Sequence, residues 1–575
     1  MKNILKLSVV NTIVLSLILN SLASFAQQKI TSPEEYFGFQ MGADYKLARW
    51  DKIVDYFYLL EKQSDKIKVM DLGPSSEGHP FLLTIISSPE NLANLDRLQL
   101  INKKICDPRG VSEDELNSYI EEGKAIIFES MSLHASEVGG TQMSPELAYD
   151  LLTRGDKEAK QILDNVVFFM VPCFNPDGEV MITDWYNETE GTEYDGLSMP
   201  YLYQKYSGHD NNRDGDYFNL PESRLMAKAM YVDWQPQAYI DHHHMGSYGA
   251  RFYVPPYCDP IRPYADPLVW RELSWYGAHI AYKLQEEGFQ GVLNAAQYAG
   301  WGHFGWHWIT PFHNIAGMLT ESAGVNLASP VYVHPDQLKA NARMFPEYEA
   351  QSTFPDPWPG GWWHLRDIVA QQKSAAWSAL DLAARNKETV LKTAILKAQN
   401  QTQRGAEGDI NTLVIPAKQH DYLTAVRMIN KLLQSGIEIE KADKEFVADD
   451  KIYGEGSYII SLAQPRRGLI MNLLTETHYA DNSWTRSENG VPFNPYDMAT
   501  HTMYEFMGVD VQSLNSNIDS KFPVVKELEN IPGTVEKGTA GYWIDGRQNA
   551  AFQAVNLLLN EKIPVKRLDT YSGQL

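Results

Sequence analysis

The sequence predicts an α/β fold with a mixed sheet that has helices on both faces, followed by a second α/β domain. Apolar, strand-like runs alternate with helical segments from about residue 65 to residue 325. A segment rich in proline and glycine, 354–361, interrupts this pattern, and Gly405 and Gly408 mark a boundary. A new strand–helix–strand pattern follows. A chain of 575 residues is also long enough for two or more domains.

The elements of the first region follow from length, apolar runs and flanking turn residues. Helical spacing appears at 145–154 and 223–232, and a long helix is expected at 365–397. The expected strands are 67–72, 81–87, 125–130, 166–172, 238–241 and 315–320.

The second region repeats the same kind of pattern on a smaller scale. Strands are expected at 412–415 and 437–439, on either side of a helix at 422–433. A similar unit is expected at 541–544, 549–560 and 564–567. The sequence shows no ligand-binding pattern in this region.

The N-terminus has the features of a cleavable secretory signal. Lys2 and Lys6 precede an apolar stretch from residue 9 to residue 19, and small residues come just before Gln27. We therefore expect residues 1–26 to be removed and the mature protein to be exported, either to the periplasm or to the medium. No later apolar run reaches about 18 residues, so stable membrane insertion is not expected.

The charge of the chain argues against nucleic acid as a partner. Residues 1–26 carry two lysines and no acidic residue, so their removal takes the net charge from −23 to −25. Binding to phosphates requires clustered cations. The chain has three cysteines, Cys106, Cys173 and Cys258, which is too few for a disulfide framework.

Histidine and glutamate side chains follow the expected strands. His134 and Glu137 lie three residues apart after the 125–130 strand, and His242-His243-His244 follows the 238–241 strand about a hundred residues later. Ligands of open α/β sheets gather outside the carboxyl ends of the strands. Two imidazoles and one carboxylate leave the fourth position of a catalytic zinc open for water. The pattern favours a metallohydrolase.

Each feature has a plainer interpretation when it stands alone. A His-x-x-Glu pair arises by chance in a chain with 15 histidines, and three adjacent histidines also fit a polar loop. Asn175-Pro-Asp-Gly178 has the residue types of a type I turn. Glu321 differs, because a carboxylate at a buried strand end needs a partner.

Taken in order, these features resemble the zinc carboxypeptidase family of pancreatic carboxypeptidase A. The resemblance covers roughly residues 30–390. It implies a carboxypeptidase-like catalytic domain at 27–400. Residues 405–575 are left as an accessory α/β domain of unknown role, which stops soon after its last expected strand, as an incomplete domain would. The motifs are Ser75-Ser-Glu-Gly-His-Pro80, His134-x-x-Glu137, Asn175-Pro-Asp-Gly178, Gly208-His-Asp-Asn-Asn-Arg213, Asp241-His-His243 and Thr320-Glu321.

The resemblance implies a single zinc ion per chain, with His134, Glu137 and His243 as its ligands. The family places one ligand histidine in an Asp-x-His pattern at a strand end, and Asp241 and His243 match it. Alternation along a strand puts those two side chains on one face and His242 on the other. His244 stays open as the alternative ligand.

Two carboxylates receive roles from the same resemblance. Asp210 matches the family aspartate that accepts the other ring N–H of a ligand histidine, which sets the tautomer and orientation of the ring. Glu321 matches the general base, which takes a proton from zinc-activated water and returns it to the leaving amine. The implied activity is the removal of C-terminal residues from peptides.

Asn212 and Arg213 match the pair that binds the terminal carboxylate of the substrate, for which the planar fork of a guanidinium is suited. A solvated loop with a structural salt bridge is their plainer interpretation. Tyr298 is the candidate for the mobile tyrosine of the family. The oxyanion-stabilising arginine has no match, because residues 178–212 contain no arginine. Lys205 and Arg251 are the candidates to replace it.

Two other function classes remain open. A zinc deacylase or amidase acting on small N-acyl amino acids or cell-wall peptides would use the same centre. The expected partner is therefore a peptide or an N-acyl amino acid. A non-enzymatic binding protein could keep the fold alone, but the full ligand set together with Glu321 argues against it.

Overall fold

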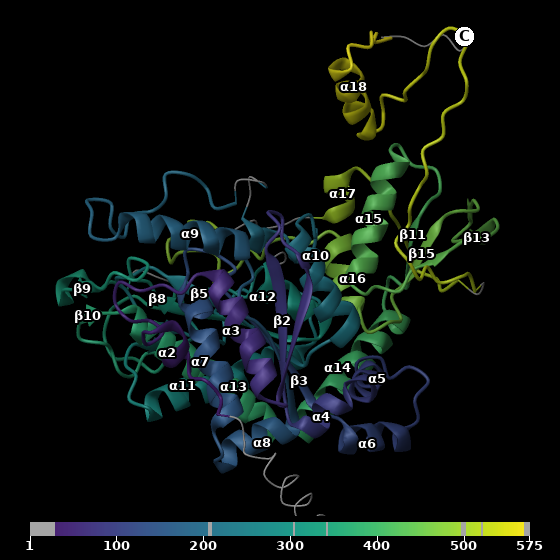
Figure 1. Cartoon of the computed structure of the whole chain (residues 1–575). Helices are drawn as coiled ribbons and strands as arrows, with labels where there is room; N and C mark the ends of the chain where they lie inside the picture. Colours follow the sequence, from purple (N-terminus) through teal and green to yellow (C-terminus); the bar gives the residue numbers. More distant parts are fainter. Residues whose placement is uncertain are drawn as a thin grey trace, which may run out of the picture.

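The computed structural model describes residues 29–204, 207, 210–302, 305–340, 343–495, 502–518 and 521–568 (Figure 1). The expected signal peptide lies outside these residues. Within the described ranges, no helix combines the length and the apolar character needed to cross a membrane.

An eight-stranded mixed sheet forms the centre of the first region, as the sequence predicts. Its strands are β1 (Ile67–Pro74), β2 (Pro80–Ile86), β3 (Ala125–Met131), β4 (Val166–Val171), β5 (Ala238–Met245), β6 (Phe252–Tyr253), β7 (Val292–Leu293) and β8 (Ala316–Ala323). Their order across the sheet is β1-β2-β4-β3-β5-β8-β6-β7. The four strands β4, β3, β5 and β8 run parallel, so their carboxyl ends share one edge.

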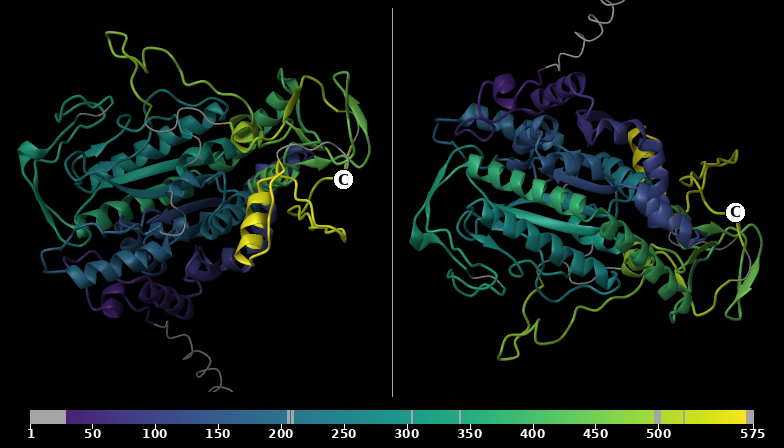
Figure 2. Two further views of the ribbon diagram at one scale, coloured as in Figure 1. Left: turned by 90° about the horizontal axis from the view of Figure 1, so that it is seen from above. Right: turned by 90° about the horizontal axis from the view of Figure 1, so that it is seen from below.

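Helices cover both faces of this sheet (Figure 2). Because of this, β3, β4 and β8 are buried at every residue, as parallel strands usually are. One face packs against α3 (Trp50–Gln63), α7 (Gly139–Thr153), α8 (Lys157–Asn165), α11 (Pro267–Glu286) and α13 (Leu365–Arg385). The other face packs against α5 (Leu95–Cys106), α10 (Pro221–Ala227), the π-helix η2 (Lys228–Trp234) and α12 (Trp306–Ile309).

Two helical predictions differ from the structure. The single helix expected at 365–397 is two helices, α13 and α14 (Lys387–Glu407), separated by Asn386 at φ −120° and ψ 26°. Asn175 caps α9 (Pro176–Thr189) and does not open an isolated turn, since its Oδ1 accepts the Gly178 N–H at 2.9 Å. Proline at the first helical position loses no hydrogen bond, so residues that suit a type I turn also suit a helix start.

The C-terminal region contains a four-stranded antiparallel sheet in the order β12-β15-β11-β16. The predicted unit at 412–439 is present, although its second strand starts later, at Glu440. The strands are β11 (Thr412–Ile415), β12 (Glu440–Lys441), β15 (Tyr458–Ser461) and β16 (Gln512–Leu514). The helices are α15 (Tyr422–Gln434), α16 (Arg467–Leu474) and α17 (Met503–Met507).

For the second unit predicted in this region, the prediction of two strands is wrong. Its helix is present as α18 (Ala550–Asn560), but 541–544 and 564–567 form no strand among the described residues. A strand needs a partner for its backbone groups, and Tyr542 and Trp543 are exposed to solvent. In α18 the only buried residue is Ala551, and the helix projects from the body of the protein (Figure 1), to which its N-cap Asn549 is tied by an N–H that donates to Asp421 Oδ2 at 2.8 Å.

One hydrophobic cluster joins the central sheet to the C-terminal region. Phe128 and Phe169, on β3 and β4, stack with their ring centroids 4.6 Å apart. The same cluster contains Ile429 of α15 and Leu469 of α16, and both are fully buried. The C-terminal region therefore covers part of one face of the central sheet.

Shorter elements complete the described fold. They are α2 (Pro33–Phe37), α4 (Pro89–Ala93), α6 (Glu113–Glu122), η1 (Asn211–Arg213), η3 (Thr310–His313), η4 (Pro335–Gln337), β9 (Val331–Val333), β10 (Gly361–Trp363), β13 (Phe446–Ala448) and β14 (Lys451–Tyr453).

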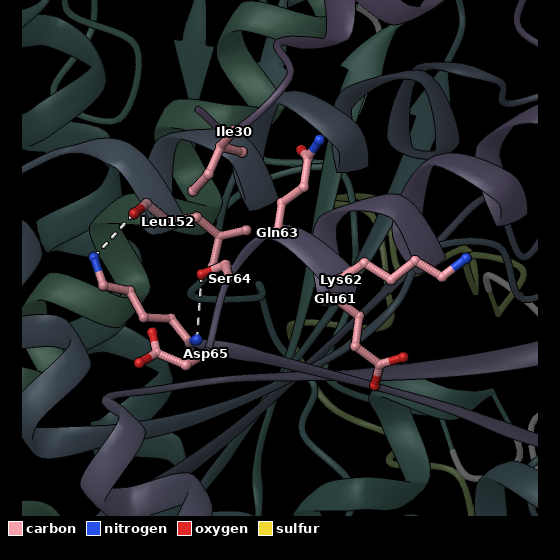
Figure 3. A pocket seen from close by; sticks show the side chains of 8 residues that line it. Ile30, Glu61, Lys62, Gln63, Ser64, Asp65 and Leu152 are labelled. Atoms are coloured by element: carbon pink, nitrogen blue, oxygen red, sulfur yellow. Dashed lines mark hydrogen bonds between the residues drawn. The ribbon is translucent and has the colours of Figure 1, made fainter. Parts of the chain in front are cut away.

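A surface hollow of about 400 Å³ lies between the end of α3 and the end of α7 (Figure 3). Its lining includes Ser64, Lys66 and Leu152, and the Lys66 Nζ donates to Leu152 O at 2.9 Å. α7 begins at the carboxyl edge of the parallel strands and ends in this hollow. The hollow therefore lies toward the edge opposite to the predicted site.

Candidate metal centre

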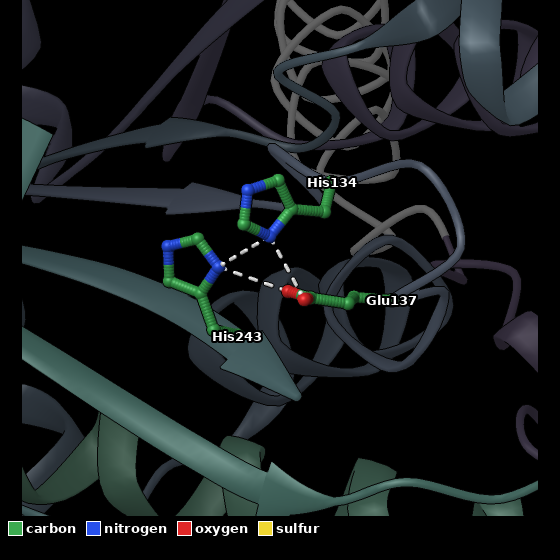
Figure 4. Close-up of side chains that lie close together, drawn as sticks. All are labelled: His134, Glu137 and His243. Carbon is green, nitrogen blue, oxygen red and sulfur yellow. Dashed lines mark hydrogen bonds and ion pairs between the residues drawn. The ribbon is translucent and has the colours of Figure 1, made fainter. Parts of the chain in front are cut away.

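His134, Glu137 and His243 bring three ligand atoms together at the carboxyl ends of β3 and β5 (Figure 4). The Nδ1 atoms of the two histidines are 3.2 Å apart. Glu137 faces both rings, with Oε1 2.8 Å from His134 Nδ1 and Oε2 2.9 Å from His243 Nδ1. The three residues that the sequence nominates as metal ligands thus converge on one point.

A tight turn between β3 and α7 presents His134 and Glu137 on the same side. β3 ends at Met131, and Ser132 then adopts a positive φ of 48°. The Ser132 Oγ donates to Glu137 O at 2.8 Å and accepts the Thr141 N–H at 3.1 Å. One hydroxyl therefore fastens the turn to the start of α7.

Alternation along β5 separates the adjacent histidines. His243 and Asp241 lie on the face of the metal group, with His243 Nε2 2.8 Å from Asp241 Oδ2. His242 points to the opposite face and is fully buried. There its Nδ1 lies 2.8 Å from Thr320 Oγ1 and its Nε2 lies 3.3 Å from Glu129 Oε2.

His244, the alternative ligand, lies outside the converging group. Its ring packs against the start of α7, where a Cβ on Gly139 would come within 2.5 Å of the His244 Nε2. Burial lowers the pKa of His244 to about 4, so the ring is neutral. This geometry favours His243 over His244.

Each candidate ligand histidine has its second ring nitrogen against an aspartate. His134 Nε2 lies 3.1 Å from Asp210 Oδ1, which is the placement that the resemblance implies for Asp210. His243 Nε2 lies against Asp241 in the same way. A carboxylate on Nε2 keeps the proton there and leaves the Nδ1 lone pair free for a metal.

The carboxylates and imidazoles of this group shift each other's pKa values. Burial lowers the pKa of His134, but Glu137 and Asp210 outweigh it and hold the pKa well above its usual value. For His243, Asp241 and Glu137 outweigh burial in the same direction. Burial raises the pKa of Asp210, but the His134 contact prevails and lowers it to about 2.

The donor set fits a zinc ion. Tetrahedral zinc with bonds of about 2.0–2.1 Å needs ligand atoms about 3.3 Å apart, and the contacts among the two imidazoles and the two carboxylate oxygens of Glu137 are 2.8 to 3.2 Å long. Two Nδ1 atoms that face each other repel unless a proton or a cation lies between them. With the Nε2 protons held by Asp210 and Asp241, a cation satisfies both nitrogens and Glu137 at once.

Glu321 lies next to His243 because the two residues pair in the parallel ladder of β5 and β8. Burial raises the pKa of Glu321 to about 8, and a hydrogen bond with the Tyr298 side chain opposes that shift. The ring of Tyr298 packs edge-on against Tyr253, with centroids 4.7 Å apart. The structure thus puts Tyr298 in contact with the predicted base.

The predicted carboxylate-binding pair lies on the same turn as Asp210. The Asn212 N–H donates to Asp210 Oδ1 at 2.8 Å, which forms the start of η1. Arg213 Nη1 donates to Asn212 O at 3.0 Å and lies 3.7 Å from Asp210 Oδ2, while 30% of its side chain is exposed. The Asn212 Oδ1 accepts the Trp306 N–H at 3.1 Å, so this side chain also has a structural role.

Lys205 and Arg251 were the candidates to replace the missing oxyanion-stabilising arginine. Lys205 lies outside the described residues. Arg251 is fully buried, and its Nη2 donates to Ser247 O at 2.6 Å and to Gly249 O at 2.8 Å. Its guanidinium therefore holds the loop after β5.

Two side chains that the sequence analysis did not nominate also lie near His134, Glu137 and His243. Tyr203 hydrogen-bonds Ser136, beside Glu137, and burial raises the pKa of its hydroxyl, so it stays a donor. His307, on α12, has its Nδ1 3.8 Å from Asp241 Oδ2. A histidine between two tryptophans was the available signal for His307, because a buried imidazole needs a polar partner. Tyr203 had no comparable signal.

Solved structures with a similar chain path include metallocarboxypeptidases. Carboxypeptidase A from Helicoverpa armigera is 15% identical, with 66% of this chain and 82% of that chain covered and a TM-score of 0.37. Metallo-carboxypeptidase from Burkholderia cenocepacia is 15% identical, with 59% and 69% covered and a TM-score of 0.36. Metallo-carboxypeptidase from Pseudomonas aeruginosa, in complex with (2-guanidinoethylmercapto)succinic acid, is 12% identical, with 59% and 68% covered and a TM-score of 0.37. No curated protein matches this chain.

Part of the sequence also matches a known protein family. Residues 53–286 match the family described as zinc carboxypeptidase. This segment includes His134, Glu137, His243 and Arg213, and it ends before Tyr298 and Glu321. The match to the zinc carboxypeptidase family therefore covers this segment of the chain.

Proposed function

We propose that the chain is an exported zinc-dependent carboxypeptidase that removes C-terminal residues from peptides. The observation that carries the proposal is the convergence of His134 Nδ1, His243 Nδ1 and the Glu137 carboxylate beside Glu321. These three residues would hold one zinc ion per chain. When bound, zinc activates water and polarises a carbonyl oxygen.

Glu321 moves the proton in this proposal. It is buried and stands in register with His243, beside the proposed ligand group. A carboxylate with a raised pKa accepts a proton from water readily and returns it to the leaving amine. Tyr298 hydrogen-bonds this carboxylate and orients it.

Asn212 and Arg213 bind the terminal carboxylate of the peptide. The Arg213 guanidinium is partly exposed and sits on the turn that also places Asp210 against His134. The distance from guanidinium to metal is therefore set by one short turn. A fixed distance of this kind selects the last peptide bond of the substrate.

A comparison of free and amidated peptides tests this polarity. Wild-type protein should release one residue at a time from peptides with a free C-terminus. Amidation should slow hydrolysis about tenfold to a hundredfold, because the guanidinium loses its charged partner. Arg213→Ala should remove that discrimination and keep zinc, whereas Arg97→Ala, which removes an exposed ion-paired arginine, should change neither.

Equal cleavage of free and amidated peptides by the wild-type protein would contradict the carboxypeptidase proposal. Release of acyl groups from N-acyl amino acids or cell-wall peptides would then support the amidase alternative. Zinc-loaded protein that binds these compounds without turnover would support a binding protein.

A further inference from the structure

One turn of helix, α12, connects the proposed substrate-binding pair to Asp241, the aspartate that contacts the proposed ligand His243. The Trp306 N–H donates to Asn212 Oδ1 at 3.1 Å. The next residue, His307, has its Nδ1 3.8 Å from Asp241 Oδ2. The residue after it, Trp308, has its ring 6.0 Å from the Arg213 guanidinium carbon. Three consecutive residues therefore meet both halves of the proposed site.

Asp241 is a fully buried carboxylate whose two oxygens have different surroundings. Oδ1 accepts from Ser130 Oγ at 3.1 Å, and that hydroxyl lies 2.7 Å from the Tyr239 hydroxyl. Oδ2 faces His243 Nε2 at 2.8 Å and His307 Nδ1 at 3.8 Å. A buried carboxylate is costly unless donors surround it, so both imidazoles contribute to keeping Asp241 charged and in place.

Among the described residues, His307 has no hydrogen-bond partner for its imidazole. It is 3% exposed, and neither of its ring nitrogens makes a hydrogen bond to a described residue. Its ring packs against the rings of Trp308 and Tyr257, whose centroids lie 4.5 Å and 6.0 Å from the centroid of the imidazole. A histidine held among aromatic rings with Nδ1 directed at one carboxylate is placed to act on that carboxylate.

We propose that His307 is a positioning residue of the metal centre: it fixes Asp241, which in turn holds the His243 ring with Nδ1 directed at His134 and Glu137. This inference rests on the proposed zinc site. At 3.8 Å the contact is longer than a hydrogen bond, and it acts as an N–H dipole on a charge in a low-dielectric interior. The same helical turn then sets the metal ligand and the carboxylate-binding pair together.

Zinc affinity, measured by competition with a chelator, tests the proposal without an activity assay. His307→Phe should weaken zinc binding about tenfold to a hundredfold, the usual cost of losing an outer partner of a metal ligand. His307→Asn should restore most of the affinity, because its amide nitrogen can occupy the position of Nδ1. His313→Phe is the matched control, since His313 is also buried and stacks on Tyr231 at 3.8 Å. It should leave zinc affinity unchanged.

The spectrum of cobalt-substituted protein gives a second readout. His307→Phe should shift the visible absorption bands of bound cobalt, because the His243 ring changes orientation, whereas His307→Asn and His313→Phe should not. If His307→Phe does not fold, Asp241→Asn carries the test, since it keeps the shape of the side chain. It should weaken zinc binding, and adding His307→Leu, which removes the imidazole without the bulk of a phenyl ring, should change the affinity no further, because the two act in series.

Three results separate the outcomes. Unchanged zinc affinity and an unchanged cobalt spectrum in His307→Phe, or additive effects of the Asp241 and His307 substitutions, would overturn the positioning role. A second zinc ion per wild-type chain that is lost in His307→Phe would also overturn it, since His307 would then be a ligand. Failure of the wild-type protein to bind zinc at all would instead refute the proposed function.

Discussion

His243 and Glu321 occupy the same register position of the β5–β8 pair, so their side chains leave the sheet side by side on one face. The ladder between two buried strands fixes this relationship, and no loop is needed to bring the two residues together. Sites built on strands hold their side chains more precisely than sites built on loops. The proposed base is therefore tied to a proposed ligand by backbone hydrogen bonds alone.

We expect Glu321→Gln to separate metal binding from turnover. Glutamine keeps the size of the side chain but cannot take a proton, so hydrolysis should fall about 10²–10⁴-fold. Zinc content, measured by atomic emission, should stay at the wild-type level. Glu222→Gln is the control, because Glu222 is also buried but its carboxylate binds Ser76. Substantial turnover by Glu321→Gln would assign the base to another residue.

The neighbouring histidines His242 and His243 should give opposite results. His243→Ala should lose zinc, because it removes the Nδ1 that faces Glu137 at 2.9 Å. His242→Ala should keep zinc but lower the melting temperature, because Glu129 loses its imidazole partner in a buried position. Metal analysis and calorimetry on the two variants check this pair. Retention of zinc by His243→Ala would return His244 to consideration.

Stability should decrease as the pH rises through the neutral range, and Glu179 should be one cause. Burial raises the pKa of Glu179 to about 8 from the usual 4.5. The native state therefore keeps a proton that the unfolded chain has already released, so unfolding becomes easier from about pH 4.5 to about pH 8.

Glu179→Gln should flatten that decline. The amide oxygen can accept the Trp50 N–H and the amide nitrogen can donate to Thr183 Oγ1, which the wild-type carboxyl contacts at 3.0 Å and 2.9 Å. Urea unfolding at several pH values in the presence of zinc measures the difference. The exposed Glu388→Gln is the control and should keep the wild-type slope. Identical slopes for wild type and Glu179→Gln would show that Glu179 titrates normally.

A core substitution in the C-terminal region should destabilise the central sheet as well. Ile429 is fully buried in the cluster that contains Phe128 and Phe169, so Ile429→Ala should cost about 2–5 kcal/mol. Calorimetry should show one transition at a lower temperature, accompanied by zinc release. Val447→Ala, at a position 67% exposed, should leave the transition in place. Two separate transitions, of which only one moves, would show that the regions unfold independently.

The sequence predicts those parts of the fold that depend on local pattern. Continuous apolar runs, such as β4, and turn residues at their ends identify the central strands, and period-two alternation separates His243 from His242. The family resemblance supplied the rest of the ligand set. Each of these predictions concerns residues whose neighbours along the chain define their environment.

Contacts between distant segments could not be predicted in the same way. The strand pattern at 541–544 was the wrong interpretation because no strand lies beside it among the described residues, and pattern alone does not show whether a partner exists. His307 reaches Asp241 only through the packing of α12 on the sheet. The register that aligns Glu321 with His243 likewise depends on how β8 docks against β5.

The cluster that joins the two regions also has a consequence for how the protein is made. Part of the sheet face that carries Phe128 and Phe169 is covered by side chains that come after residue 412 in the chain. During synthesis, the strands of the metal centre therefore exist for hundreds of residues before that face has its cover. Until Leu469 has been added, the nascent chain exposes apolar side chains of this sheet face to solvent. We expect it to depend on chaperones during that interval.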